Sequence, residues 1–301
     1  MSLLVTGSIG IDTVVTPHGQ ADEVLGGTAV YFSFAATQYV PVRLVAVVGE
    51  DFPAAFRDIL TSREIDLAGL ELRKGSQTFR WTGKFTGDMN EAETVDVKLN
   101  VLGEAPPSVP PAFLDSQTVF LANTHPTAQR DVLSQLHGPK ISVCDSMNLW
   151  IANERDSLMK TLRLVTGVIV NDAEARQLTG TVNLITAGEQ LLGFGPQFAV
   201  VKKGEHGALL FTSDGVYPIP AFPSKDVRDP TGAGDSFAGG FMGYLAQCGQ
   251  CDTASLRRAM MHGTVAASFT IEDFSLGRVR NVTRSEIDQR VDLLTGMLRI
   301  E

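Results

Sequence analysis

The sequence predicts an α/β fold, with a mostly parallel central sheet that carries helices on both faces and a small antiparallel β lid. Short apolar, β-branched runs recur along the 301 residues, and most of them are separated by stretches of helical period. Strands that alternate with helices in this way form a parallel sheet covered on both faces. Two segments, 13–26 and 76–101, break the alternation and predict antiparallel strands instead.

The elements of the main sheet follow from these runs in order. We expect strands at 3–6, 44–48, 119–122, 141–144, 168–170, 198–201 and 208–211. We expect helices at 28–39, 52–62, 127–136, 153–164, 172–178, 235–247, 254–269 and 285–298. A capping box marks the start of the last helix, where the side chains of Thr283 and Glu286 are expected to accept hydrogen bonds from each other's backbone amides. These elements assign residues 1–12, 27–75 and 102–301 to the main domain.

The segment 76–101 predicts a hairpin with one apolar face. Phe79, Trp81 and Phe85 alternate with polar residues in its first half, and Val95 and Val97 do so after a polar turn. A few strands with an apolar face are not stable alone in water, so that face closes over a cleft, packs on the main domain or meets another subunit. We interpret 13–26 and 76–101 as a lid, and we expect a homodimer that forms through it.

Composition and charge exclude several classes of protein. Hydrophobic residues make up 44% and charged residues 20% of the chain, and no run approaches the ~18 apolar residues of a membrane span. The net charge of −9 opposes binding to nucleic acid or to an anionic membrane. The N-terminal residues lack the basic region of a signal peptide, so a cytoplasmic location is expected. The three cysteines, two of them in a lone C-x-x-C at 248–251, are expected to be reduced thiols.

The segment 229–240, DPTGAGDSFAGG, carries the clearest chemical signal. A turn of small residues opens directly into a predicted helix, so backbone N–H groups converge at the positive end of the helix dipole. The small residues Gly232, Ala233 and Gly234 let a phosphoryl group approach the backbone closely. Asp235, in the first turn, can accept a proton from an attacking hydroxyl. The segment therefore predicts an anion hole with a catalytic base beside it.

This segment resembles the C-terminal signature of the ribokinase-like (PfkB) family of carbohydrate and nucleoside kinases. Further motifs resemble the family, in its order, along essentially the whole chain: GSIGID at 7–12, GGTA at 26–29, VVGED at 47–51, NDAE at 171–174 and KKGEHGA at 202–208. The resemblance implies a ribokinase-like fold. It also implies ATP-dependent, Mg²⁺-requiring transfer of a phosphoryl group to a substrate hydroxyl, which we expect to be a primary CH₂OH.

The resemblance implies roles for residues outside the anion hole as well. For the acceptor it implies contacts from Asp12, Gly26 and Gly27. For the nucleotide, its phosphates and Mg²⁺ it implies Asn171, Glu174, Lys203, Gly204, Gly207 and Thr231. Asn171 and Glu174 are expected to act on Mg²⁺ through water. Asp229 is a candidate for a monovalent cation such as K⁺, as in some relatives, and His262 is a candidate for adenine contact or for burial in the core.

Two positions depart from the family pattern. Tyr31 stands where the family often has an asparagine that contacts substrate, and Asn123 lies near the position of a ribokinase glutamate that contacts ribose. These departures argue against ribose, but we expect both residues on the substrate side. Several candidates follow predicted strands whose carboxyl ends share one edge of the sheet, where open α/β folds bind ligands: Asp12, Asn123, Asp145, Asn171 and Lys203.

The substrate class follows from the charges expected around the acceptor. Asp12 and Asp235 both face it, which disfavours a phosphate beside the attacking hydroxyl, whereas Arg80 on the lid could hold a more distant phosphate. We therefore expect a neutral sugar, keep a nucleoside as the close alternative, and place a sugar phosphate third. Tyr31 and Trp81 offer aromatic surfaces to a sugar ring or a base.

Other nucleotide-binding classes fit the sequence poorly. The first predicted strand is not followed by G-x-G-x-x-G, and the Gly83-Lys84 pair lacks an upstream Walker loop. A sugar or nucleotide sensor that keeps the fold without turnover remains the alternative outside enzymes. The presence of Asp235 argues against that alternative, because a degenerate kinase would most readily lose its base.

Overall fold

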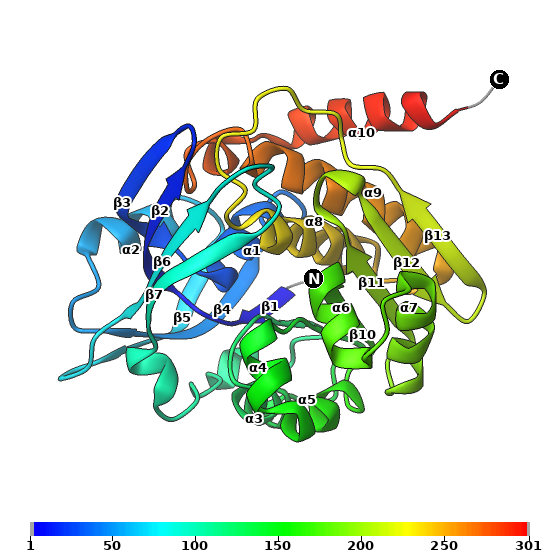
Figure 1. Cartoon of the computed structure of the whole chain (residues 1–301). Helices are drawn as coiled ribbons and strands as arrows, with labels where there is room; N and C mark the ends of the chain where they lie inside the picture. The colour runs from blue at the N-terminus through cyan, green and yellow to red at the C-terminus, as the bar shows by residue number, and fades with distance from the viewer. Residues whose placement is uncertain (1–2, 300–301) are drawn as a thin grey trace.

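The centre of the molecule is a nine-stranded sheet, seen in the computed structural model, which describes residues 3–299 (Figure 1). The strand order is β13-β12-β11-β10-β9-β8-β1-β4-β5. The strands from β5 to β11 are parallel, and β12 and β13 extend the sheet in antiparallel fashion. Their bounds are β1 (Leu3–Thr6), β4 (Val42–Gly49), β5 (Ile65–Arg73), β8 (Thr118–Leu121), β9 (Ile141–Cys144), β10 (Gly167–Asn171), β11 (Phe198–Lys202), β12 (Ala208–Thr212) and β13 (Gly215–Ile219).

Helices cover both faces of this sheet because both faces of its strands are apolar. In β1, Leu3 and Val5 pack into the core beneath α1, α8 and α9, whereas Leu4 packs into the core beneath α3, α5, α6 and α7. The helix bounds are α1 (Thr28–Ala36), α2 (Ala54–Thr61), α3 (Pro126–Gln135), α4 (Asn148–Asn153), α5 (Arg155–Leu162), α6 (Asp172–Thr179), α7 (Leu184–Gly193), α8 (Ala233–Cys248), α9 (Thr253–Thr270) and α10 (Arg284–Leu298).

A second, four-stranded sheet forms the lid, in the order β3 (Gly19–Gly26), β2 (Gly10–Thr16), β6 (Phe79–Phe85) and β7 (Ala92–Lys98). β2 pairs with β3 and β6 pairs with β7 in antiparallel hairpins, and a parallel pairing of β2 with β6 joins the two. Asp12 was expected just beyond the first strand of the main sheet. It lies instead inside β2, because that strand begins at Gly10.

The predicted fold class is confirmed, but two strands and two helices of the described residues were not predicted: β5, β13, α4 and α7. β5 is an edge strand in which buried and exposed residues are mixed, so it lacks the continuous apolar run of a central parallel strand. The helix expected at 153–164 corresponds to α5, and α4 lies immediately before it, with Glu154 between the two. Within residues 3–299, no helix combines the length and the apolar character that crossing a membrane requires.

Candidate active site

A cleft of about 1020 Å³ lies between the lid and the carboxyl ends of the central strands. Phe79, Trp81 and Val97 of the lid line it, so the apolar side of the lid faces the cleft. Ten of the expected site residues line this cleft: Asp12, Gly27, Tyr31, Asn123, Asn171, Glu174, Lys203, Gly204, Thr231 and Asp235. The expected homodimer through the lid stays a prediction.

The anion hole lies at the start of α8. Gly232 is its N-cap residue, with φ +75°, and a β-carbon there would lie 2.2 Å from Cγ of Tyr31. Glycine is therefore required both by the backbone and by the tyrosine ring. The amide of Ala233 was expected to be free, but it donates to the carbonyl of Pro230 at 3.1 Å. The amides of Gly234 and Asp235 have no backbone partner within the described chain and remain available.

Asp235 is half-buried at this helix terminus and lines the cleft. Burial raises the pKa of its carboxyl to about 6, and the positive charge of Lys202 partly opposes that rise. A carboxyl with this pKa is ionised at neutral pH but still accepts a proton readily. Asp235 thus has the position and the basicity of a general base.

Asp12 forms the opposite wall, where the lid meets the main sheet. A β-carbon on Gly26 would lie 1.9 Å from Oδ2 of Asp12, so the glycine makes room for this carboxyl. Oδ1 of Asp12 is buried and has no hydrogen-bond partner in the described structure. Burial, together with the charges of Asp235 and Asp229, raises the pKa of Asp12 to about 7, and the hydrogen bond from the N–H of Gly27 opposes this rise. An unpaired buried carboxyl oxygen on a cleft wall suits a substrate hydroxyl.

Asn123 holds a residue that the sequence analysis missed. Its Oδ1 accepts a hydrogen bond from Nε1 of Trp150 at 3.0 Å, and its Nδ2 lies 3.1 Å from Sδ of Met147. His125 packs edge-on against Trp150 with ring centroids 5.1 Å apart. Trp150 and Met147 both line the cleft, so Asn123 positions an aromatic wall rather than offering a free amide. The only signal for Trp150 in the sequence was its place shortly after the end of a predicted strand.

Asn171 and Glu174 lie together at the start of α6. Oδ1 of Asn171 accepts from the amide of Glu174, and the amide of Asn171 donates to Oε2 of Glu174, both at 2.7 Å. This capping box fixes both side chains at the edge of the cleft. Burial raises the pKa of Glu174 to about 7, while Lys202 and the Asn171 amide oppose the rise.

The residues present fit Mg²⁺ held through water and phosphate. Among residues 3–299 no group of three or more His, Cys, Asp or Glu side chains is arranged to hold a metal directly. Glu174 lines the cleft with one oxygen outside the capping box, and buried Oδ1 of Asp145 has no partner. Carboxylate oxygens in this arrangement can accept from metal-bound water, and Mg²⁺ usually keeps several waters.

We expect Glu174→Gln to raise the Mg²⁺ concentration for half-maximal rate about three- to tenfold, because an amide oxygen attracts hydrated Mg²⁺ less than a carboxylate does. Glutamine can still accept from the Asn171 amide, so the helix cap survives. The measurement is the initial rate across a Mg²⁺ titration. Glu286→Gln is the matched control, since it makes the same change in the capping box of α10, remote from the cleft. An unchanged Mg²⁺ titration for Glu174→Gln would remove Glu174 from this role.

Lys203, Gly204 and Gly207 form the turn after β11. The amide of Lys203 donates to the carbonyl of Gly207 at 2.7 Å, and both glycines have positive φ. Asn90, at the tip of the lid hairpin, donates from Nδ2 to Oε1 of Glu205 at 3.1 Å. The lid therefore reaches across the cleft and contacts this turn directly.

Three expected site residues lie elsewhere. Arg80 does not line the cleft, because it pairs with Glu23 at 2.8 Å and Asp51 at 3.2 Å. His262 is buried, with Nδ1 3.1 Å from the Tyr39 hydroxyl, so of its two expected places the structure shows the core and not the cleft wall. Burial lowers the pKa of His262 to about 4, which keeps it neutral.

Asp229 is the third of these residues. It is fully buried, and its two oxygens accept from the amides of Thr231 at 2.9 Å and Ser275 at 3.0 Å. These hydrogen bonds tie the segment before the anion hole to the loop after α9. A monovalent cation at Asp229 stays a prediction. Gly26 and Gly207 support the site through the close approaches of their backbones to Asp12 and to the carbonyl of Ile219.

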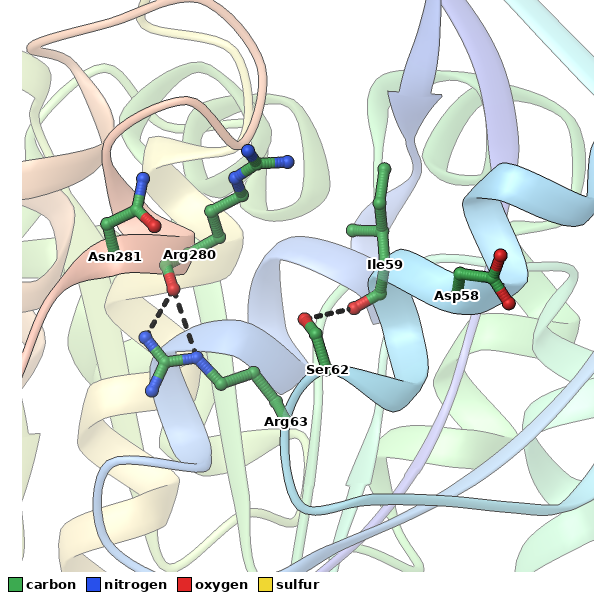
Figure 2. Close-up of a pocket in the computed structure, with 6 residues that line it drawn as sticks. All are labelled: Asp58, Ile59, Ser62, Arg63, Arg280 and Asn281. Atoms are coloured by element: carbon green, nitrogen blue, oxygen red, sulfur yellow. Dashed lines mark hydrogen bonds between the residues drawn. The ribbon is translucent and has the colours of Figure 1, made fainter.

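A second hollow, of about 580 Å³, lies on the surface between the end of α2 and residues 280–281 (Figure 2). Figure 2 shows the guanidinium of Arg63 directed at the carbonyl of Arg280, to which it donates. Nη2 of Arg63 also donates to the carbonyl of Val282 at 2.9 Å. Arg63 is thus occupied in joining two segments of the chain, and none of the expected site residues lines this hollow.

Comparison with known proteins decides the family. The family model described as pfkB family carbohydrate kinase matches residues 23–281. The chain belongs to this family. Family membership makes the protein a kinase that transfers a phosphoryl group to a hydroxyl of a sugar or nucleoside, and it implies ATP and Mg²⁺.

Relatives of this family member include nucleoside and riboside kinases. It is 31% identical over 258 residues to a cytidine kinase of Thermococcus kodakarensis, which covers 81% of this chain and 88% of the relative. Its fold is similar to the Burkholderia thailandensis nucleoside kinase in complex with inosine, with TM-score 0.79, 20% identity and 98% of both chains covered. It is also similar to the Salmonella enterica aminoimidazole riboside kinase, with TM-score 0.77, 18% identity, and 97% and 100% coverage.

Proposed function

We propose that this kinase phosphorylates the primary hydroxyl of a nucleoside. The sequence alone favours a neutral sugar, with a nucleoside as the alternative. The observation that favours a nucleoside instead is Trp150, which Asn123 holds in the cleft wall. The lining continues along α4 from Met147 to Asn153, beyond the Asp12 region where a pentose would bind. That extension suits a flat aromatic base, because indole rings stack on bases.

The similarity to named kinases supports this choice. A cytidine kinase matches most of the chain at 31% identity, and a Methanothermobacter thermautotrophicus nucleoside kinase matches 76% of it at 27% identity. A sugar phosphate is a weaker candidate. Arg80, its expected phosphate ligand, already pairs with Glu23 and Asp51 outside the cleft lining.

The proposed chemistry is in-line transfer of the γ-phosphoryl group of ATP. Asp12 orients the sugar through its unpaired carboxyl oxygen, and Asp235 accepts the proton of the attacking hydroxyl. The free amides of Gly234 and Asp235 receive the phosphoryl oxygens. Mg²⁺, when bound, neutralises charge on the phosphates, with Glu174 placed to hold its waters. Positioning and electrostatic stabilisation supply most of the acceleration for this loose transition state.

A coupled assay of ADP formation across substrates tests this proposal. We expect cytidine, inosine or another nucleoside to have a kcat/KM at least about 10²-fold above that of ribose, because base stacking contributes about 1–3 kcal/mol and binding positions the hydroxyl. Fructose and fructose 6-phosphate complete the panel. A neutral sugar that outperforms every nucleoside would overturn the proposed acceptor.

Trp150→Ala separates the base from the sugar in the same assay. Its kcat/KM for the best nucleoside should fall about tenfold to 10²-fold, while its activity on ribose should change little. Trp150→Phe is the control, because it keeps a stacking ring and loses only the hydrogen bond to Asn123. Equal losses on nucleoside and ribose would show that Trp150 supports the fold of the cleft rather than a base.

A further inference from the structure

Lys202 lies beside the anion hole, although the sequence analysis chose its neighbour Lys203. Side chains alternate along β11, so Lys202 lies on the side of Phe198 and Val200, which is the side that α8 covers. A β-carbon built on Gly234 would lie 2.6 Å from Nζ of Lys202. The ammonium therefore occupies the space that a side chain on Gly234 would fill, next to the two free amides of α8.

The ammonium of Lys202 and the first turn of α8 bring two positive groups to the same place. The N-terminus of a helix carries roughly half a positive charge, which disfavours an ammonium nearby. Within residues 3–299, Lys202 makes no ion pair and no side-chain hydrogen bond. Two positive groups that converge on one point, neither of them neutralised by a contacting carboxylate, indicate that an anion binds between them.

Several carboxyl groups lie near the ammonium of Lys202. Burial raises the pKa values of Asp235 of α8, Glu174 of α6 and Asp145 after β9, and the charge of Lys202 opposes each rise. Asp12 of β2 adds a fourth carboxyl, whose charge interacts with that of Asp235. At neutral pH Asp235 is ionised, so an incoming phosphoryl group meets repulsion from it that the ammonium offsets.

We propose that Lys202 is a catalytic residue that donates from Nζ to an oxygen of the transferred γ-phosphoryl group. The inference rests on the proposed transfer at Asp235. The acceptor oxygen forms a bond to phosphorus as the bond between phosphorus and the bridging β,γ-oxygen breaks. The acceptor proton goes to Asp235, and ADP leaves with the bridging oxygen. Lys202 keeps its proton throughout and stabilises the charge on the phosphoryl oxygens.

The proposal makes Lys202 a discriminator between a triphosphate and a diphosphate. ADP lacks the γ-phosphoryl group, so loss of the ammonium should weaken a non-hydrolysable ATP analogue but hardly affect ADP. A merely structural role would lower the affinity for both nucleotides alike. Titration calorimetry without acceptor measures these affinities directly, and it does not depend on catalysis.

The variants are Lys202→Met, Lys202→Arg and, as the matched control, Lys140→Met, which removes an exposed lysine before β9. For Lys202→Met we expect at least about a tenfold rise in Kd for the analogue, less than about a threefold rise for ADP, and a kcat lower by about 10²- to 10³-fold. Lys202→Arg should keep the preference for the analogue, because it keeps a cationic donor. Lys140→Met should behave as the wild type in both measurements.

Lys202→Gln is a second variant, because it also removes the positive charge but keeps a polar side chain in place of the lysine. It should also lose the preference for the analogue, and it keeps the proposal testable if Lys202→Met does not fold. Equal losses of affinity for the analogue and for ADP, or no loss of affinity for either, would overturn the assignment of Lys202. Failure of the base assignment would look different, since Asp235→Asn would then keep its kcat while Lys202→Met still lost its preference for the analogue.

Discussion

Replacement of Asp235 by asparagine is expected to lower kcat about 10²- to 10⁴-fold while the affinities for nucleotide and acceptor change only a few-fold. The amide has nearly the shape of the carboxylate, so it keeps the packing at the start of α8, but it cannot accept the proton of the attacking hydroxyl. Steady-state kinetics with both substrates varied, together with calorimetric binding of ADP, measure the two effects separately.

The pH profile gives an independent measure of the same residue. Burial raises the pKa of Asp235 to about 6, and the base acts only when it is ionised. The kcat/KM of the wild type should therefore rise with pH through about 6, and the ionisation of Asp12, whose pKa is about 7, should extend this rise towards pH 7. Asp235→Asn should lose the part of the rise near pH 6, whereas Asp58→Asn, an exposed substitution on α2, should keep it. Wild-type kcat in Asp235→Asn would exclude Asp235 as the base.

Replacement of Asp12 by asparagine is expected to have the second large effect. It should change the kinetic constants for the acceptor rather than those for the nucleotide. Oδ1 of Asp12 is buried on the cleft wall without a partner, so a substrate hydroxyl that donates to it gains a charge-assisted hydrogen bond. We expect kcat/KM for the acceptor to fall about 10²-fold, because the site loses that bond and the orientation it provides. The KM for ATP should stay within a few-fold of the wild type.

Thermal unfolding of Asp12→Asn distinguishes a lost contact from a damaged fold. The pKa of Asp12 is raised from 3.8 to about 7, so the folded protein binds this proton more tightly than the unfolded chain does. The stability that this proton confers is complete below about pH 4 and is lost as the pH rises through about 7. Asparagine carries no charge, so the Tm of the ligand-free variant at pH 8 should not be below that of the wild type. A markedly lower Tm, with equal losses for acceptor and nucleotide, would show a structural role.

The parts of the site that could be predicted are those built from neighbouring residues. Gly232, Gly234 and Asp235 belong to one turn and the start of one helix, so local rules for helix termini place their amides and carboxyl. Asn171 and Glu174 are three residues apart, and the capping box of α6 brings them together. Family motifs identified both segments, because such motifs record short-range geometry.

The direction of a side chain at the end of a strand could not be read in the same way. The strand expected at 198–201 continues to Lys202, so its last side chain points to α8. A shift of one residue moves a side chain to the other face of a sheet, so a strand expected to end at residue 201 does not predict that Lys202 points to α8. The amide of Ala233 was likewise expected to be free, but it closes the turn onto Pro230.

The sequence by itself determined the fold class, the family and the segments that carry the chemistry, because apolar periodicity and helix termini act over a few residues. Only the tertiary structure decided which of the candidate groups are free to bind a ligand. Asn123 bonds to Trp150, Arg80 to Glu23 and His262 to Tyr39, and these partners are 27, 57 and 223 residues apart. Hydrogen bonds between such distant segments make Asn123 a support for Trp150 and hold Arg80 outside the cleft lining. Burial keeps His262 neutral in the core.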